Sequence, residues 1–128
     1  MRDNCVFCGI VAGDIPSTQV AESERVLAFR DINPAAPVHV LLIPKEHVAD
    51  GTADLRSEHG PILGELFELA ASVADAEGLD GTYRMIVNSG AGSGQTVFHL
   101  HFHLLGGWGR AASTPKTLAD ETGGVPLS

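Results

Sequence analysis

The hydrophobic and polar positions of the chain divide it into short runs that predict a mixed α+β domain. Two apolar, β-branched runs cover Val26–Phe29 and Val38–Ile43, and the proline-containing segment Asp31–Pro37 predicts a turn that makes them a hairpin-like pair. Further strands are predicted at Tyr83–Asn88 and, with the strongest signal, at Val97–Leu105. We therefore expect an antiparallel sheet of about five short strands.

Helical periodicity occurs in two places. Apolar residues recur with helical spacing over Ser57–Glu77, which predicts one long helix with one buried face, and Gly78 follows where a C′ glycine would end it. A shorter apolar run, Phe7–Ala12, predicts a short helix. The last residues show little apolar periodicity, so we expect one domain at 1–109 followed by a C-terminal tail at 110–128.

Composition narrows the classes of function. The chain has no apolar stretch approaching the roughly 20 residues that a membrane span needs, so no membrane partner is expected. Sixteen acidic against eight basic residues give a net charge of -8, which argues against nucleic acid as a partner. Backbone N–H groups can still hold a small anionic substrate. The first residues lack the apolar segment of a secretory signal, and we expect a cytoplasmic protein.

The two cysteines of the chain, Cys5 and Cys8, are spaced C-x-x-C. In a reducing compartment this spacing favours a metal or redox role over a structural disulfide. The more specific interpretation is that the two cysteines supply two of the four ligands of a zinc site. It requires two further ligands, and histidines supply these most readily.

Three histidines alternate with apolar residues in the last predicted strand. Since side chains alternate across a strand, His99, His101 and His103 would share one face. The apolar residues beside them would share the other face, toward the core: Phe98, Leu100, Phe102 and Leu104. A row of three imidazoles has little structural rationale, so a functional role is favoured over that of buried, hydrogen-bonded polar residues.

Two chemistries fit this row. In the first, the histidines bind a catalytic zinc that keeps an open position for an activated water. In the second, one imidazole attacks phosphorus to form a covalent intermediate, while a neighbour orients or protonates the reacting groups. The segment Gly90–Gly94, followed by Gln95 and Thr96, offers unhindered backbone N–H groups and a hydroxyl to a phosphate oxyanion, which favours the second chemistry.

The run Gly94–Gly107 resembles the signature of the histidine triad (HIT) family, in which three histidines alternate with apolar residues. The segments Phe29–His39, Ile43–His47 and Tyr83–Asn88 resemble the Hint branch in order and spacing, so the resemblance covers residues 5–107. It implies the HIT fold, a five-stranded antiparallel sheet with one long and one short helix that dimerises into a continuous ten-stranded sheet. It also implies a nucleotide-binding hydrolase that cleaves purine nucleoside phosphoramidates or related adenylated compounds.

The resemblance also implies residue roles. His101 matches the nucleophile that forms a nucleotidyl-histidine, and His103, His39 and His99 match the supporting histidines. Asp31 matches the carboxylate that accepts the ribose hydroxyls. The other matched positions form the base pocket and the phosphate contacts, respectively Phe7, Ile10, Phe29 and Ile32, and Asn88, Gln95, Thr96 and Val97. Without the resemblance, His39 would be interpreted as a core imidazole, Asp31 as a turn residue and the apolar set as ordinary core.

Some HIT proteins hold a structural zinc with a C-x-x-C pair, a later histidine and the first histidine of the triad. Here the resemblance assigns these ligands to Cys5, Cys8, His47 and His99. A closed set of four ligands leaves no open position, so this Zn²⁺ would fasten the N-terminus to the sheet and take no part in the chemistry. The alternative is a pair of reduced cysteines with an unligated His47.

The implied partners are a purine nucleotide such as AMP or GMP and a second copy of the chain. Thr96 departs from the Hint pattern, which usually has serine there, but it keeps the hydroxyl for protonation of the leaving group. Two alternatives remain beside the phosphoramidate hydrolase. One is a dinucleoside polyphosphate hydrolase, and the other is a nucleotide-binding sensor or scaffold with little turnover.

Overall fold

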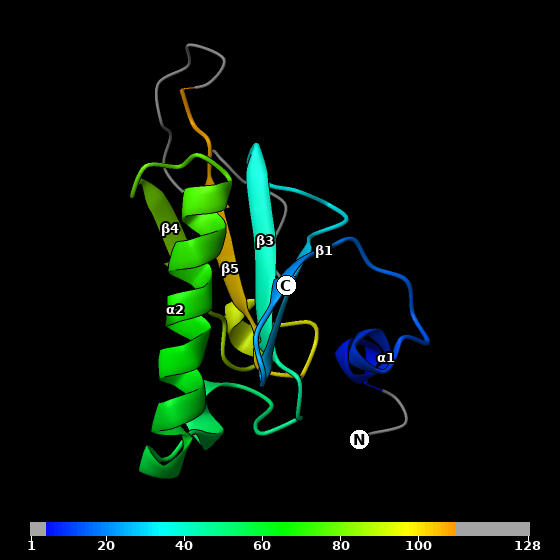
Figure 1. Ribbon diagram of the computed structural model, residues 1–128. Helices are drawn as coiled ribbons and strands as arrows, with labels where there is room; N and C mark the ends of the chain where they lie inside the picture. Colours follow the sequence, from blue (N-terminus) through cyan, green and yellow to red (C-terminus); the bar gives the residue numbers. More distant parts are fainter. Residues whose placement is uncertain (1–4, 110–128) are drawn as a thin grey trace.

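Five antiparallel strands form one sheet in the order β1-β2-β3-β5-β4 (Figure 1). The computed structural model of the protein describes residues 5–109, so the tail predicted at 110–128 lies outside the described residues. The strands are, in chain order, β1 Gln19–Glu22, β2 Val26–Arg30, β3 Val38–Pro44, β4 Tyr83–Ile86 and β5 Phe102–Gly106. Every neighbouring pair is antiparallel, as the sequence predicts.

The long helix α2 (Gly60–Ala76) covers one face of the sheet (Figure 1). Its buried side chains have helical spacing, and they are Ile62, Leu66, Ala70, Val73 and Ala74. The helix begins at Gly60, after a 3-10 turn at Ser57–His59, and Gly78 beyond its end has the left-handed φ of +73° expected of a C′ glycine. No helix among the described residues has the length and apolar character needed to cross a membrane.

The short helix α1 (Val6–Ala12) packs on the opposite face. Phe7 and Ile10 on this helix form a second apolar cluster with residues of β2 and β3, namely Leu27, Phe29, Leu41 and Ile43. Because side chains alternate along a strand, the neighbours Val40 and Leu42 belong instead to the core beneath α2. The sheet is therefore buried on both faces over β2 and β3.

Strand β1 lies outside the strand ranges predicted from the sequence. Its four residues, Gln-Val-Ala-Glu, are half-buried or exposed at the edge of the sheet, so they lack the apolar run that marks β2 and β3. The predicted hairpin-like pair is confirmed as β2 and β3, and the strand predicted at Tyr83–Asn88 ends earlier, at Ile86.

The strand predicted over Val97–Leu105 is wrong in its first half, because β5 begins only at Phe102. Backbone groups of the preceding residues bond outside the ladder: the Val97 carbonyl accepts from the Gln95 side chain, and the Leu100 N–H donates to the Ala49 carbonyl. Phe98, predicted in the core, is 45% exposed. The other predicted core residues are buried, namely Leu100, Phe102 and Leu104.

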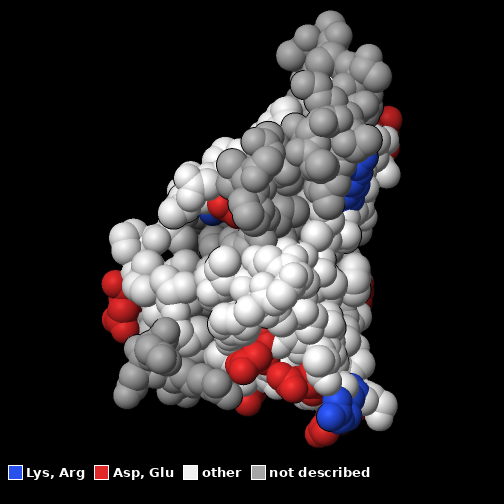
Figure 2. Space-filling model, turned by 180° about the vertical axis from the view of Figure 1, so that it is seen from behind, with Lys and Arg blue, Asp and Glu red and all other residues white. Residues whose placement is uncertain are grey.

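The described part of the molecular surface agrees with the acidic composition. Figure 2 shows one face on which uncharged atoms dominate and acidic side chains gather toward the edges. No continuous basic surface is formed by the described residues on that face.

Candidate active site and metal site

Pairing of β3 with β5 brings His39 and His103 together on the face that α1 covers. Leu41 lies opposite His103 in the register, and His39 is two residues away on the same face of β3. Nε2 of His39 lies 2.9 Å from Nδ1 of His103, and the ring centroids are 5.1 Å apart. Both rings are buried, so this hydrogen bond is shielded from water.

The backbone fixes the direction of this hydrogen bond. The Ala35 N–H donates to Nδ1 of His39 over 3.0 Å, so in the neutral ring Nε2 must carry the proton. That proton is donated to Nδ1 of His103, which leaves the proton of His103 on its Nε2. This second N–H is buried and has no hydrogen-bond partner among the described residues. A ligand oxygen would satisfy it.

His101 precedes β5 and lies beside this pair. Its ring centroid is 5.1 Å from that of His103 and 5.0 Å from that of Phe7, which packs edge-on at 87°. Nδ1 of His101 lies 2.8 Å from the His99 carbonyl oxygen. A carbonyl only accepts, so Nδ1 carries the proton and Nε2 presents the lone pair. The ring therefore has the tautomer that a nucleophile needs.

Burial keeps the rings of His39 and His103 uncharged. Burial lowers the pKa of His103 to about 3, with a further contribution from His101 and His39. Burial also lowers the pKa of His39, against the opposing effect of the Asp31 carboxylate, whose Oδ2 lies 3.4 Å from its Nε2. Both rings are neutral at pH 7, as the chain of hydrogen bonds requires.

A cavity of about 290 Å³ lies between α1 and the end of β2. The histidines do not line it, but Phe7, whose ring packs against that of His101, does. Most of its lining is apolar, and it contains six of the residues predicted for substrate binding: Phe7, Ile10, Phe29, Asp31, Ile32 and Val97. Ile32 is 88% exposed, which puts it at the rim. Asp31 accepts the Asn33 N–H at 2.8 Å through Oδ1, as a turn residue would. Asp31 therefore stabilises the turn and also lines the cavity, and its role toward a ribose stays a prediction.

The predicted phosphate-contacting residues differ in accessibility. Thr96 is exposed and Asn88 half-buried, whereas Gln95 is buried with its side chain bonded to backbone groups. None of the three lines the cavity just described. The glycine-rich turn between Asn88 and Gln95 uses left-handed backbone at Gly90 (φ +88°) and Gly94 (φ +107°), which explains its composition.

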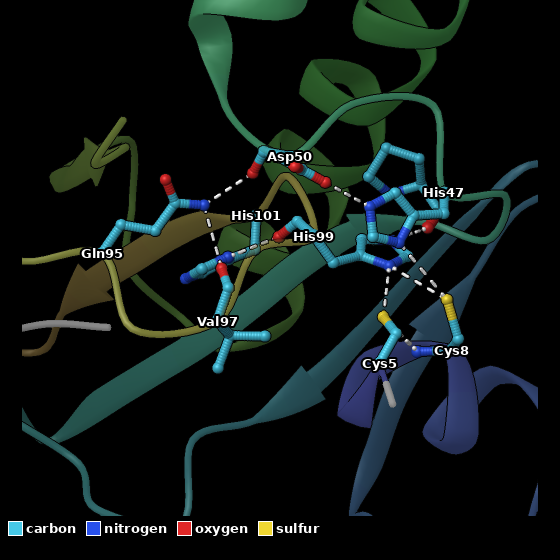
Figure 3. A network of polar contacts seen from close by, with 9 residues as sticks. Cys5, Cys8, His47, Asp50, Gln95, Val97, His99 and His101 are labelled. Carbon is cyan, nitrogen blue, oxygen red and sulfur yellow. Dashed lines mark hydrogen bonds and ion pairs between the residues drawn. The ribbon is translucent and has the colours of Figure 1, made fainter. Parts of the chain in front are cut away.

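Cys5, Cys8, His47 and His99 converge at the N-terminus of α1, and their ligand atoms all lie within 4.8 Å of one another (Figure 3). Nδ1 of His99 is 3.3 Å from Sγ of Cys5 and 3.5 Å from Sγ of Cys8, and Nδ1 of His47 is 3.5 Å from Sγ of Cys8. Two ligands of a tetrahedral zinc, one sulfur and one nitrogen, lie about 3.6 Å apart. The four residues fit a closed zinc site.

Two acceptors behind the histidines fix the tautomers that a metal requires. Nε2 of His99 lies 2.8 Å from the Pro44 carbonyl oxygen, and Nε2 of His47 lies 2.7 Å from Oδ1 of Asp50. Each Nε2 therefore carries the proton, and both Nδ1 lone pairs face the thiols. The sequence interpretation missed Asp50, although a carboxylate three residues after His47 is a readable signal.

A second group, Asp31, His39 and His103, also brings potential metal ligands within 4.8 Å of one another. The same hydrogen-bond argument disfavours metal there. The Ala35 N–H occupies Nδ1 of His39, so the Nε2 that faces the group carries a proton in the neutral ring. This group is a chain of hydrogen bonds, whereas the Cys and His group has the donor chemistry of a metal site.

The fold and these two clusters define a small α+β protein with a histidine site and a second cluster, the metal-type site, which is formed by Cys5, Cys8, His47 and His99. The model of the HIT domain family matches residues 12–109, and the chain belongs to this family.

Named relatives and a solved structure agree with this assignment. The chain is 50% identical over 105 residues to the 14 kDa zinc-binding protein of Zea mays, with 80% of each chain covered. It is 42% identical over 109 residues to the purine nucleoside phosphoramidase of Escherichia coli K12, covering 84% of this chain and 90% of that protein. A HIT family hydrolase from Clostridium thermocellum superposes with a TM-score of 0.82 at 48% identity, covering 91% of this chain and 98% of the other.

Proposed function

We propose that the protein is a nucleotide-binding hydrolase that cleaves purine nucleoside phosphoramidates through a covalent nucleotidyl-histidine on His101. The observation that carries the proposal is the tautomer of this ring. The His99 carbonyl holds the proton on Nδ1, so the Nε2 lone pair is available to attack phosphorus without prior loss of a proton. The activity named for the Escherichia coli relative supports the substrate class.

In this mechanism a bond forms between Nε2 of His101 and the α-phosphorus while the bond from phosphorus to the leaving amine breaks. The Nε2–H of His103 donates to a phosphate oxygen, since it is a buried donor whose orientation His39 sets. The Thr96 hydroxyl protonates the leaving amine. Water then attacks the same phosphorus and gives its proton to the Thr96 oxygen, which restores the hydroxyl. The bond from phosphorus to Nε2 of His101 breaks, so the nucleoside monophosphate leaves and His101 is regenerated.

The cavity supports a purine nucleotide such as AMP or GMP as the ligand. Its apolar walls include Phe7, Ile10 and Phe29, which would stack against or surround a base. Asp31 lies on the same lining, where its carboxylate would accept the ribose hydroxyls. The predicted phosphate contacts at Asn88, Thr96 and Val97 remain part of this proposal, and Gln95 would support this region through its bonds to backbone groups.

We further propose that Cys5, Cys8, His47 and His99 hold a structural Zn²⁺. The four ligand atoms, their separations and the acceptors behind both histidines support a closed tetrahedral site, which has no position for an activated water. The metal would fasten α1, and with it one wall of the cavity, to the sheet. A cytoplasmic location fits this site, because Cys5 and Cys8 are thiols rather than a disulfide.

We also propose a homodimer in which β4 of each subunit joins the two sheets into ten strands. Strand β4 is an edge strand, and its four residues are only half-buried in the single chain. Phe67 of α2, which packs edge-on against Phe102 at 5.3 Å, leaves 47% of its surface exposed. Light scattering on a Phe67→Glu variant tests this: the wild type should have the mass of two chains and the variant that of one.

The hydrolase proposal is tested with a fluorogenic adenosine phosphoramidate. His101→Ala should lower kcat by at least about 10³-fold, because no other group forms the covalent intermediate, and His59→Ala is the control away from the site. Rapid acid quenching of the wild type, followed by mass spectrometry, should detect one nucleotidyl group on the peptide that contains His101. Turnover by His101→Ala at the wild-type rate would exclude the covalent mechanism.

The same assay separates the alternatives. Loss of activity on removal of the metal, with His101→Ala still active, would indicate a zinc hydrolase. Preference for diadenosine polyphosphates over the phosphoramidate would indicate the dinucleoside polyphosphate hydrolase. Tight AMP binding without turnover would indicate a sensor or scaffold.

A further inference from the structure

Gln95 lies between the glycine-rich turn and the histidines, and the residue is 3% exposed. Its amide nitrogen donates to the Asp50 carbonyl at 2.6 Å and to the Val97 carbonyl at 2.9 Å. Its Oε1 accepts the Gly90 N–H at 2.8 Å. Both amide hydrogens are therefore used within the protein, and a phosphate contact by this nitrogen would cost one of these bonds.

The first of these bonds leads to the metal-type site. Asp50 meets Gln95 through its backbone carbonyl, and its carboxylate lies 2.7 Å from Nε2 of the candidate ligand His47 (Figure 3). The following residue, Gly51, packs tightly here, since a Cβ on it would lie 2.8 Å from Oγ of Ser89 and 3.1 Å from Oε1 of Gln95. The turn that carries the candidate metal ligand His47 therefore packs closely against Gln95.

The other two bonds lead to the phosphate region of the proposed function. They hold the Gly90 N–H at one end of the glycine-rich turn and the Val97 carbonyl just beyond its other end. A turn that contains several glycines has high conformational freedom, so a buried side chain that bonds both ends restricts it strongly. One amide therefore joins the metal-ligand turn to the glycine-rich turn that precedes the proposed phosphate contacts Thr96 and Val97.

We propose that Gln95 is a positioning residue that couples metal occupancy at Cys5, Cys8, His47 and His99 to the affinity for the nucleotide phosphate. The inference rests on the proposed function, because it takes the phosphate of a purine nucleotide as the ligand. A bound metal orders His47 and, through Asp50 and Gln95, the glycine-rich turn. Coupling between two sites is reciprocal, so the nucleotide must tighten the metal by the same factor.

The test compares the AMP dissociation constants of metal-loaded and metal-free full-length protein by calorimetry. In the wild type, zinc should tighten AMP about 5-fold or more. Gln95→Glu keeps the size and Oε1 but removes both amide hydrogens, and its ratio of the two constants should fall toward one. The matched control is Gln19→Glu, the same change at the other glutamine of the chain, which is exposed, and it should keep the wild-type ratio.

Zinc affinity, measured by competition with a chromogenic chelator, is the second readout. AMP should tighten zinc in the wild type and in Gln19→Glu, and not in Gln95→Glu. Equal ratios in Gln95→Glu and the wild type, or a wild-type ratio of one, would overturn the inference. A direct phosphate contact by the Gln95 side chain would instead weaken AMP equally in loaded and metal-free protein.

Two further outcomes are covered. If circular dichroism finds Gln95→Glu unfolded, Gln95→Asn replaces it, because its shorter amide cannot reach all three backbone groups and should also abolish the coupling. If the loaded wild type binds no AMP, the proposed function fails and zinc affinity alone decides. Gln95→Glu must then bind zinc several-fold more weakly than Gln19→Glu, and equal affinities overturn the inference.

Discussion

The side chain of His39 holds His103 in a single tautomer, since the Nε2 of His39, 2.9 Å from Nδ1 of His103, is the protonated nitrogen. The Ala35 N–H, which bonds the other nitrogen of His39, sets this direction. A backbone group in the turn before β3 thereby determines which nitrogen of the β5 histidine His103 carries the proton. Geometry of this kind lets a neutral imidazole act as a defined donor to phosphate.

Replacement of His39, which donates to Nδ1 of His103, should slow the reaction. In His39→Leu the ring of His103 is free to adopt either tautomer, and we expect kcat to fall about 100-fold with little change in KM. Steady-state kinetics on the adenosine phosphoramidate measure both constants, with His59→Leu as a control outside the site. A change of kcat below about 3-fold would mean that the orientation of His103 does not depend on His39.

Asp31→Asn should weaken nucleotide binding more than it slows turnover. The carboxylate is an acceptor only, and a hydrogen bond to a charged group is worth about 1.5–3 kcal/mol, so AMP affinity should fall about 10-fold or more. Binding of 2′,3′-dideoxy-AMP, which has no ribose hydroxyls, serves as the control and should not change. Equal losses for AMP and the dideoxy analogue would assign Asp31 to the turn alone, through its bond to the Asn33 N–H.

Asp50→Ala should weaken zinc, because it removes the acceptor that fixes the tautomer of His47. Loss of such a partner behind a metal ligand typically lowers the affinity for the metal 10–100-fold. Competition with a chromogenic chelator at fixed pH measures the zinc affinity. Asp54→Ala, an exposed carboxylate in the neighbouring 3-10 helix, is the matched control. Unchanged zinc affinity in Asp50→Ala would show that the Asp50 carboxylate does not orient the ligand.

Glu65 on α2 should stabilise the fold in a pH-dependent way. Its pKa falls from 4.5 to about 2, chiefly through the Ser23 hydroxyl and then through the backbone and side chain of Arg25. A lowered folded-state pKa means that the contribution is complete above pH 4.5 and disappears as the pH falls through about 2.

Thermal unfolding checks the role of Glu65. We expect Glu65→Gln to melt a few degrees below the wild type at pH 7, and this difference should shrink as the pH falls from 4.5 toward 2. Glu68→Gln, on the exposed side of the same helix, should melt with the wild type at every pH. A difference that stays constant with pH would assign the effect to packing.

Local sequence patterns were sufficient for the elements with strong periodicity. The apolar runs of β2 and β3 and the spacing along α2 identified these elements within a few residues, because burial of an entire face requires such a pattern. The alternation around the histidines also predicted that Leu100, Phe102 and Leu104 face the core. The C-x-x-C spacing marked a possible metal site, and the family resemblance supplied His47 and His99.

Tertiary structure decided what periodicity cannot encode. Val97–His101 has the alternation of a strand but is not one, because its backbone groups bond to Gln95, Ala49 and His101 instead of a neighbouring strand. The three histidines are divided between two sites: His99 lies with Cys5, Cys8 and His47, and His101 lies beside His103. Which nitrogen of each ring carries the proton depends on acceptors and donors far apart in the chain, such as Pro44 and Ala35. The sequence therefore determined which side chains could take part in the chemistry. Only the fold determined which groups those side chains contact, because the contacting residues are far apart in the chain.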